Sequence, residues 1–364
     1  MKMMIYSVGT DISKDEFEAC LQRYLLLKQT HEVVARKKFA NKPSGFKAFI
    51  QWVRRHTRSH PAPIRCTMEA TGIYYEGLAL YLHQEHTEVH LSVVLPSQSK
   101  QYIQSQGLRS KTDKIDAYGL ALMGAERHLS AWKGIDPFWR ELRALTRTRA
   151  DLMDQRTQFR NQLHALDHSG LPVESVREAL EGCIQTLSQH IDQLTGQIRK
   201  HLRKRKALAE PIACLRSIPG VGLLTVAAIL AETNGFEEFY SISQLISFSG
   251  YDVRIRESGK WKGKPRITKQ GSKYIRRAMY MPATTIVRSE KGPIFEYYNS
   301  LLGTHNVKMK AHVAIQKKLL TYLFCLWNKQ ETFNPQKIYH QRAIHKKRVA
   351  SRKGEATVDT SLVL

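Results

Sequence analysis

The sequence has few cysteines and never places two of them close together. Its five cysteines are Cys20, Cys66, Cys183, Cys214 and Cys325. Because they are odd in number, scattered and free of any C-x-x-C pair, they argue against a disulfide framework and against a zinc ribbon. We therefore expect reduced, structural cysteines in a cytoplasmic protein.

Long apolar runs, a signal peptide and a nucleotide-binding loop are also missing. No stretch reaches the about 18 uncharged apolar residues that a membrane span needs. The sequence MKMMIYSVGTDIS leads straight into a strand-like segment and lacks the apolar core of a signal peptide. The GxxxxGK[ST] motif does not occur, so dependence on ATP is not expected. We therefore expect a cytoplasmic protein without a membrane partner.

Acidic residues are scarce relative to basic ones. The chain of 364 residues has 57 Lys and Arg against 32 Asp and Glu, a formal net charge of +25. Such a field attracts polyanions, and counterion release then drives binding to nucleic acid. The excess lies in stretches such as 199–206 and 337–353, which favours a nucleic-acid partner over unspecific binding of anions. The run at 199–206 is equally compatible with a solvated helix end.

The first 130 residues predict an α/β domain. Short β-favouring segments occur at 3–11, 17–22, 32–39, 64–68 and 89–95. The first three indicate a meander, and a helix is expected from Pro43 to about residue 57. Helical spacing follows each of the other two strands. Three meander strands followed by alternating strands and helices is the order of an RNase H-like fold.

The strand pattern stops at Pro137. Apolar side chains then recur at spacings of three, four and seven to about residue 205, interrupted by Gly170-Leu171-Pro172. This predicts an antiparallel helical hairpin or coiled coil over 131–206, which carries an oligomer contact or serves only as a packing element. We expect a compact, mainly α-helical domain over 207–330 and a basic tail over 331–364.

Four acids of the first domain form a candidate metal site: Asp11, Glu69, Asp113 and Asp116. Asp11 and Glu69 end the first and fourth strands, which are neighbours in an RNase H-like sheet. Asp113 and Asp116 are three residues apart and share a helix face. Converging carboxylates need a cation, and oxygen ligands suit Mg²⁺, with Mn²⁺ as a substitute. Taken singly, a helix N-cap is the simpler interpretation of Asp113 and a solvated turn residue that of Glu69, and only the joint pattern favours a metal site.

The second half of the chain has a glycine turn and a basic loop. The turn Ile218-Pro219-Gly220-Val221-Gly222 resembles a helix-hairpin-helix, in which Gly220 and Gly222 let backbone N–H groups approach a phosphate. An ordinary tight turn is the alternative. Basic residues surround Ser258-Gly259 further on and continue into a helix after Gly271. The predicted nucleic-acid contacts there are Arg254, Arg256, Lys264, Arg266, Lys269, Lys273, Arg276 and Arg277.

Several motifs in order carry a family resemblance. VGTDISK, MEATGIYY and KTDKIDA, with the arginine-rich stretch, the Ser-Gly pair and the ITKQG–IRRAMY helix, resemble the DEDD transposases of the Piv/MooV invertase group. This group includes the insertion-sequence family one-ten of bridge-RNA-guided recombinases. The resemblance covers about residues 4–125 and 207–290. It implies a RuvC-like domain whose metal-binding tetrad is formed by Asp11, Glu69, Asp113 and Asp116. It also implies that Ser258, by chemistry alone an ordinary loop serine, is the nucleophile.

The resemblance implies the partners as well. These are donor and target DNA, a noncoding guide RNA, and further copies of the chain in a homo-dimer or tetramer. The family often has a Gly-Leu-x-Pro-like turn before the loop, whereas this chain has Gly250-Tyr251-Asp252-Val253, so the loop start is expected to differ. Ser249 is a second serine close by. Two other functions stay open: a RuvC-like nuclease that uses metal-activated water, and a nucleic-acid-binding protein without catalysis.

Overall fold

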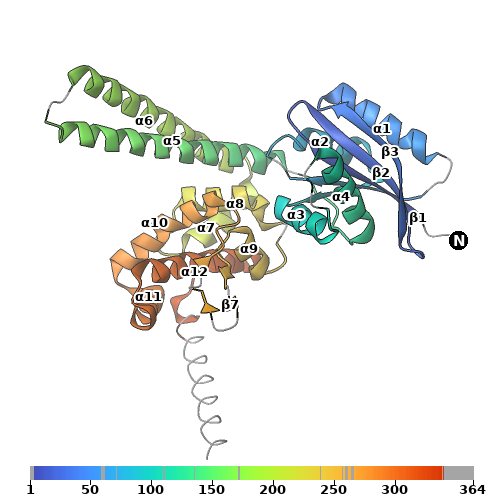
Figure 1. The fold of residues 1–364 in the computed structure, drawn as a ribbon. Helices are drawn as coiled ribbons and strands as arrows, with labels where there is room; N and C mark the ends of the chain where they lie inside the picture. The colour runs from blue at the N-terminus through green and yellow to red at the C-terminus, as the bar shows by residue number, and fades with distance from the viewer. Residues whose placement is uncertain are drawn as a thin grey trace, which may run out of the picture. The chain divides into compact units, whose positions relative to one another are not determined.

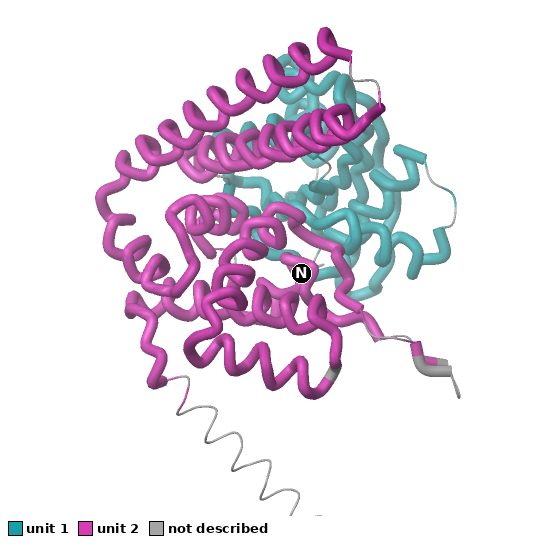
Figure 2. The backbone as a smooth tube through the Cα atoms, turned by 90° about the vertical axis from the view of Figure 1, so that its left-hand side faces the viewer, with its two compact units in different colours: residues 1–135 teal, residues 136–364 magenta. Residues whose placement is uncertain are grey.

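The computed structural model divides the chain into two compact units, residues 1–135 and 136–364 (Figure 2). It describes residues 4–58, 62–70, 72–108, 110, 112–134, 136–170, 173–237, 239–255, 257–258, 261–263, 266–337 and 339, with the backbone alone at 258, 261, 262 and 305. Most of the basic tail therefore lies outside the described residues. None of the described helices is long and apolar enough to cross a membrane. All five cysteines are free thiols.

Unit 1 is built on a mixed five-stranded sheet (Figure 1). Its strands are β1 (Met4–Ile12), β2 (Glu16–Leu25), β3 (Thr30–Ala40), β4 (Ile64–Glu69) and β5 (Val89–Val94). The order across the sheet is β3-β2-β1-β4-β5. The first three strands are antiparallel, and β4 runs parallel to both β1 and β5. The five predicted strands and the neighbouring β1 and β4 are confirmed, which agrees with an RNase H-like sheet.

Helices cover both faces of this sheet. They are α1 (Pro43–Thr57), α2 (Glu76–Glu85), α3 (Pro96–Ser105) and α4 (Asp113–Glu126). One face packs on α1 and α2, where the rings of Phe17, Phe39 and Phe49 have centroids 5.4 to 5.5 Å apart. The other face receives α4, with α3 beside it. Because neighbouring strand residues point to opposite faces, the sequence alternates between these two layers.

A glycine lets α4 lie directly on β1. A Cβ atom on Gly9 would lie 2.0 Å from the carbonyl oxygen of Ala117 and 2.2 Å from the backbone nitrogen of Ala121. Two residues earlier, the Ser7 hydroxyl donates to the Ala121 carbonyl oxygen at 2.5 Å. These contacts fix the direction of α4 along β1, so that the first turn of α4 lies toward the end of β1.

Unit 2 is mainly helical. Its first two helices, α5 (Pro137–Asp167) and α6 (Glu174–Arg203), pack along each other as the predicted antiparallel hairpin (Figure 1). The base of this hairpin belongs to the core of the unit, because Trp139, Leu142 and Ile198 are buried there. The other helices are α7 (Ala209–Arg216), α8 (Leu223–Glu232), α9 (Ile242–Phe248), α10 (Lys273–Ser289), α11 (Gly292–His305) and α12 (Lys308–Lys329), with 3-10 turns η1 (Lys206–Leu208) and η2 (Asn234–Phe236).

The basic run at 199–206 ends α6. Basic side chains suit the carbonyl-rich end of a helix. Two of them also have acidic partners in the same unit: Lys204 pairs with Glu141 at 3.3 Å, and Arg205 pairs with Asp136 at 2.5 Å. This part of the run therefore serves the structure of the hairpin base.

Two short β-pairs interrupt the helices between α9 and α10. Strand β6 (Val253–Arg254) pairs with β9 (Arg266–Ile267), and β7 (Glu257–Ser258) pairs with β8 (Trp261–Lys262). The sequence predicts only a loop here. Strands of two residues are too short to show the alternation by which a strand is recognised.

Candidate active site and nucleic-acid interface

The register of the sheet places acids of three neighbouring strands in one row. Asp11 on β1 is directly opposite Glu18 on β2. On its other side, β1 pairs with β4 as far as Thr10 and Met68, so the next pair in this register is Asp11 and Glu69. Neighbouring strands are about 4.8 Å apart. The backbone thus brings Asp11 and Glu69 side by side.

The row faces α4. Gly9 on β1 and Thr67 on β4 are opposite each other, two residues before the acids of their strands. Both lie against α4. Asp11 and Glu69 follow them by two residues and therefore point to the same side of the sheet. The acids consequently lie on the polar side of the sheet, away from the aromatic core under α1.

The first turn of α4 contains Asp113 and Asp116. Thr112 is the N-cap, because its side chain accepts a hydrogen bond from the backbone N–H of Ile115 at 3.3 Å. The simpler interpretation of Asp113 as the cap is therefore wrong. The exposed N–H groups of a helix start favour negative charge. Since this turn lies toward Asp11, the backbone directs all four predicted acids to one region of unit 1.

Glu69 is held in place by α3. Ser99 is fully buried, and its hydroxyl donates to Glu69 Oε2 at 2.6 Å. Glu69 is the last residue of β4 and is half-buried, so its interpretation as a solvated turn residue is also wrong. The hydrogen bond fixes this carboxylate at the edge of the row.

The donor set suits a hard divalent cation. It consists of carboxylate oxygens, which are the ligands of Mg²⁺ and Mn²⁺. In the same row, Glu18 Oε2 is buried without a hydrogen-bond partner among the described residues, so this oxygen can still accept a donor or a cation. No three acidic, histidine or cysteine side chains of the described segments already enclose an ion.

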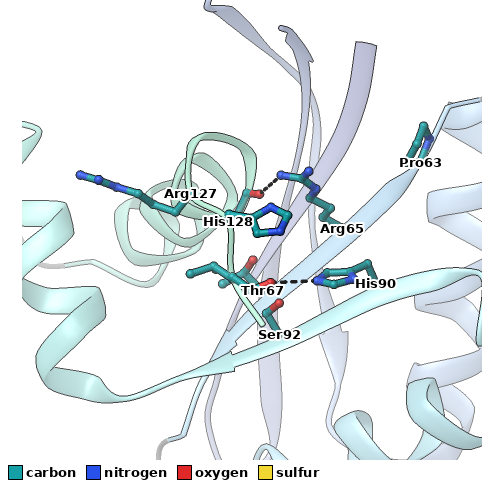
Figure 3. Close-up of a pocket in the computed structure, with 9 residues that line it drawn as sticks. Pro63, Arg65, Thr67, His90, Ser92, Arg127 and His128 are labelled. Carbon is teal, nitrogen blue, oxygen red and sulfur yellow. Dashed lines mark hydrogen bonds between the residues drawn. The ribbon is translucent and has the colours of Figure 1, made fainter. Parts of the chain in front are cut away.

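A small cavity of about 240 Å³ lies beside the first halves of β4 and β5 (Figure 3). Arg65 donates to the carbonyl oxygen of Gly124 at 3.1 Å, and His90 Nε2 lies 3.1 Å from the carbonyl oxygen of Leu129. Both contacts tie the end of α4 and the residues after it to the sheet. The residues that line the cavity thus help to anchor α4, and the acids lie at the opposite end of this helix.

Backbone hydrogen bonds join the two ends of the loop between α9 and α10, and these paired ends are called the stem. The N–H of Lys269 donates to the carbonyl of Gly250 at 3.1 Å. A Cβ atom on Gly271 would lie 2.1 Å from the carbonyl oxygen of Phe248, so this position requires glycine. Tyr251, where the family often has leucine, is buried and donates its hydroxyl to α12. The loop therefore starts from a rigid base.

Two of the predicted nucleic-acid contacts have partners within the protein. Arg276 Nη1 donates to the carbonyl oxygens of Ser249 at 2.9 Å and Gly271 at 3.2 Å, so it holds the stem. Arg277 Nη1 pairs with Asp154 at 2.6 Å and joins α10 to α5. Arg256 and Lys264 lie outside the described residues. The exposed members of the predicted set are Arg254, Arg266, Lys269 and Lys273.

Arg254 and Arg266 are directly opposite each other across β6 and β9. Both side chains are exposed. Like charges in this position destabilise a strand pair, and an anion between them would remove the repulsion. The arrangement therefore favours the binding of a phosphate at the stem of the basic loop.

Ser258 is the last residue of β7, and its backbone pairs with Trp261. Ser249 is very different, because it is fully buried and its hydroxyl donates to the carbonyl oxygen of Leu245 at 2.6 Å. A hydroxyl buried in this way does not reach a DNA phosphate. Ser249 is thereby removed as an alternative nucleophile.

The glycine turn separates α7 from α8. Gly220 has a φ of +79°, and a Cβ atom there would lie 2.9 Å from the carbonyl oxygen of Pro282 in α10. This glycine is therefore needed for packing. A Cβ atom on Gly222, the N-cap of α8, would meet no described heavy atom within 4 Å. Of the two glycines, Gly222 is the one with space for a phosphate beside it.

Two family models match the chain. The DEDD transposase model of the IS110 type, described as a transposase, matches residues 8–167, and the model described as the transposase IS116/IS110/IS902 family matches residues 212–299. The chain belongs to the IS110 family of DEDD transposases. It is accordingly an enzyme of the transposase and recombinase class that acts on DNA. The DEDD transposases are typically metal-dependent.

Curated relatives of this IS110-family transposase are similar over most of its length. The pilin gene-inverting proteins of Moraxella lacunata and Moraxella bovis are each 29% identical over 329 residues, which is 90% of this chain and 97% of theirs. The transposase for insertion sequence element IS1111A of Coxiella burnetii is 23% identical over 267 residues, 66% of this chain and 72% of that protein.

Sequence reasoning misses two residues of this region of the transposase, Glu18 in the acidic row and Ser99 beside it. Glu18 lies between Phe17 and Ala19 in a predicted strand, but the sequence does not show which residue of the neighbouring strand lies opposite it. Ser99 is an ordinary helix serine until the fold brings it to Glu69. A buried acid inside a predicted strand would have been the available signal for Glu18.

Proposed function

We propose that this transposase cuts and rejoins DNA with two groups of residues, a metal-binding tetrad in unit 1 and a serine nucleophile in unit 2. In unit 1, a RuvC-like domain would hold Mg²⁺ or Mn²⁺ with Asp11, Glu69, Asp113 and Asp116. In unit 2, Ser258 would be the nucleophile. The observation that carries the metal half is the row in which Asp11 and Glu69 lie side by side beneath the first turn of α4.

The carboxylates would act by position and charge. Asp11 and Glu69 are fixed by the sheet register, and Ser99 orients Glu69 through its hydrogen bond. The close contact at Gly9 fixes the first turn of α4. Bound Mg²⁺ would supply a Lewis acid that polarises phosphate oxygens. Preorganised acids of this kind need little rearrangement when DNA binds.

The Ser258 hydroxyl would attack a DNA phosphorus. A bond forms between its oxygen and phosphorus, the bond from phosphorus to the leaving deoxyribose oxygen breaks, and that oxygen takes up a proton. The phosphoserine link conserves the phosphodiester, so a DNA hydroxyl rejoins the strand without ATP. Arg254 and Arg266 would neutralise the phosphate, while Lys269, Lys273 and the N–H groups at Gly222 would hold the neighbouring backbone.

The partners follow from the family and from the hairpin. A noncoding guide RNA is proposed because of the family resemblance, and exposed basic side chains accept either nucleic acid. Leu163 and Ile184 on α5 and α6 are only half-buried within one chain, which supports a dimer or tetramer contact along the hairpin. Light scattering of the double variant Leu163→Lys, Ile184→Lys should show a lower mass than that of the unchanged chain.

The nucleophile is tested by trapping. A two-plasmid recombination assay would contain the DNA element with its flanking noncoding DNA, and denaturing gels would reveal a protein–DNA adduct. We expect Ser258→Ala to abolish both adduct and strand exchange, and Ser249→Ala to retain both if it folds. Cutting that persists without an adduct in Ser258→Ala would support a nuclease that uses activated water.

The metal half is tested separately. Asp11→Asn and chelation by EDTA should each abolish strand cutting, and an excess of Mg²⁺ should restore the chelated protein but not the variant. Full recombination by Asp11→Asn would contradict a catalytic tetrad and would favour a nucleic-acid-binding role without catalysis. Removal of the DNA's flanking noncoding segment should abolish targeting if an RNA guides it.

A further inference from the structure

Glu18 on β2 is a buried acid that the four-carboxylate site does not use. It is 4% exposed. Its Oε2 atom has no hydrogen-bond partner among the described residues. An ionised carboxylate loses the stabilisation of water when it is buried, so such an oxygen needs a donor or a cation.

The position of Glu18 points to a cation. It is directly opposite Asp11, so both side chains lie on the same face of the sheet. Its neighbours Phe17 and Ala19 point to the other face and are buried in the apolar core of unit 1. Glu18 therefore extends the acidic row by one strand, from Glu69 through Asp11 to β2.

The ammonium group on the strand residue opposite Glu18 is already paired with another acid. Lys38 on β3 is opposite Glu18, but its Nζ is bonded to Glu16 Oε1 at 2.5 Å, and its side chain is 48% exposed. Lys38 interacts electrostatically with both Glu18 and Asp113. Glu18 and the first turn of α4 thus both contribute to the electrostatic field at this one ammonium group.

We propose that Glu18 is a fifth carboxylate of the divalent-metal site. Its unpartnered oxygen contacts the cation directly or through one of the waters that Mg²⁺ keeps. The ligand class is a hard divalent cation, and the inference rests on the proposed metal site of Asp11, Glu69, Asp113 and Asp116. The positive charge of the ion compensates for the hydration that the Glu18 carboxylate loses on burial, which explains why an acid is tolerated at a buried strand position.

The first test is calorimetric titration of the full chain with Mn²⁺ alone. Glu18→Gln should weaken Mn²⁺ binding on the order of tenfold or more. Glu16→Gln is the matched control, because it removes the same charge from the same strand and face at an exposed, ion-paired position. It should weaken binding less than about threefold, as expected for a screened surface charge.

The second test is thermal unfolding with EDTA and with Mg²⁺, which does not depend on activity. In EDTA, Glu18→Gln should unfold at a higher temperature than the unchanged chain, since it removes a buried negative charge beside Asp11. The rise produced by Mg²⁺ should be smaller, because a weaker ligand stabilises less. A merely structural role of Glu18 predicts a lower unfolding temperature in both conditions.

The outcomes separate this proposal from the one on which it rests. Loss of Mn²⁺ binding in Asp11→Asn, with binding by Glu18→Gln as tight as in the unchanged chain, overturns the role of Glu18 alone. Equal weakening by Glu16→Gln and Glu18→Gln also overturns it. If the unchanged chain binds no divalent cation, the metal site itself fails and Glu18 with it.

Discussion

Gly9 of β1 and Ala117 of α4 lie backbone against backbone: a Cβ atom on Gly9 would be 2.0 Å from the Ala117 carbonyl oxygen. Four residues before Ala117, α4 begins with Asp113. A single glycine therefore sets the distance between the sheet that bears Asp11 and the helix turn that bears the other two acids. We therefore expect a change at this contact to affect both stability and metal binding.

The first prediction concerns this contact. Gly9→Ala should lower the free energy of unfolding by about 3 kcal/mol, because the new methyl group forces α4 off the sheet. Mn²⁺ affinity should fall with it. The control is Gly182→Ala on α6, where a Cβ atom would meet nothing within 4 Å, and where alanine should stabilise by roughly 0.5–1 kcal/mol. Denaturant unfolding measures both, and equal stability of Gly9→Ala and the unchanged chain would contradict the close contact.

The second prediction concerns the opposed arginines. If Arg254 and Arg266 each contact a DNA phosphate, replacement of both by glutamine should reduce the slope of log K against log salt by about 1.8. Fluorescence anisotropy of labelled duplex DNA between about 50 and 200 mM salt measures this slope. The control replaces Arg23 and Arg54, which are ion-paired with acids in unit 1. An unchanged slope in the Arg254 and Arg266 variant would contradict phosphate contacts by these two arginines.

The third prediction separates structure from recognition in α10. Arg276→Met should lower the free energy of unfolding by about 2 kcal/mol, because the guanidinium's bonds to backbone carbonyls are lost. The loop that Arg276 holds should become more sensitive to protease. Arg277→Met removes an exposed pair with Asp154 and should cost less than about 1 kcal/mol. Equal effects of the two variants would be evidence against the stem role of Arg276.

The fourth prediction concerns the thiols. Burial raises the pKa of Cys66 to about 12, and it also raises the pKa of Cys20. A raised pKa leaves less of the reactive thiolate at any lower pH. Iodoacetamide should therefore modify exposed Cys183 before the buried Cys66 and Cys20. Mass spectrometry should find Cys66 unmodified until the protein is denatured, and its rapid alkylation in the native protein would contradict its burial.

Local sequence patterns were enough for most elements. Short β-favouring segments predict β1, β2 and β3, and helical spacing predicts α1 and the α5–α6 hairpin, with ends that differ by a few residues. These patterns are informative because each element must bury one face, and the spacing of apolar residues along the local sequence shows which face that is. The two-residue strands around Ser258 escape because they are too short for a period. The burial of Trp139 in the core of unit 2 escapes as well, because it depends on distant helices.

The sequence by itself determined the acids, the motifs that identify the family, and the basic character of the loop. Only the tertiary structure decided which side chains meet. Strand register places Glu18 opposite Asp11, the fold brings Ser99 to Glu69, and the loop stem occupies Arg276 with backbone carbonyls. These relations join residues far apart in the chain, and they depend on which strands pair and in which register. Local periodicity reports the face on which a residue lies but not its partner across the sheet.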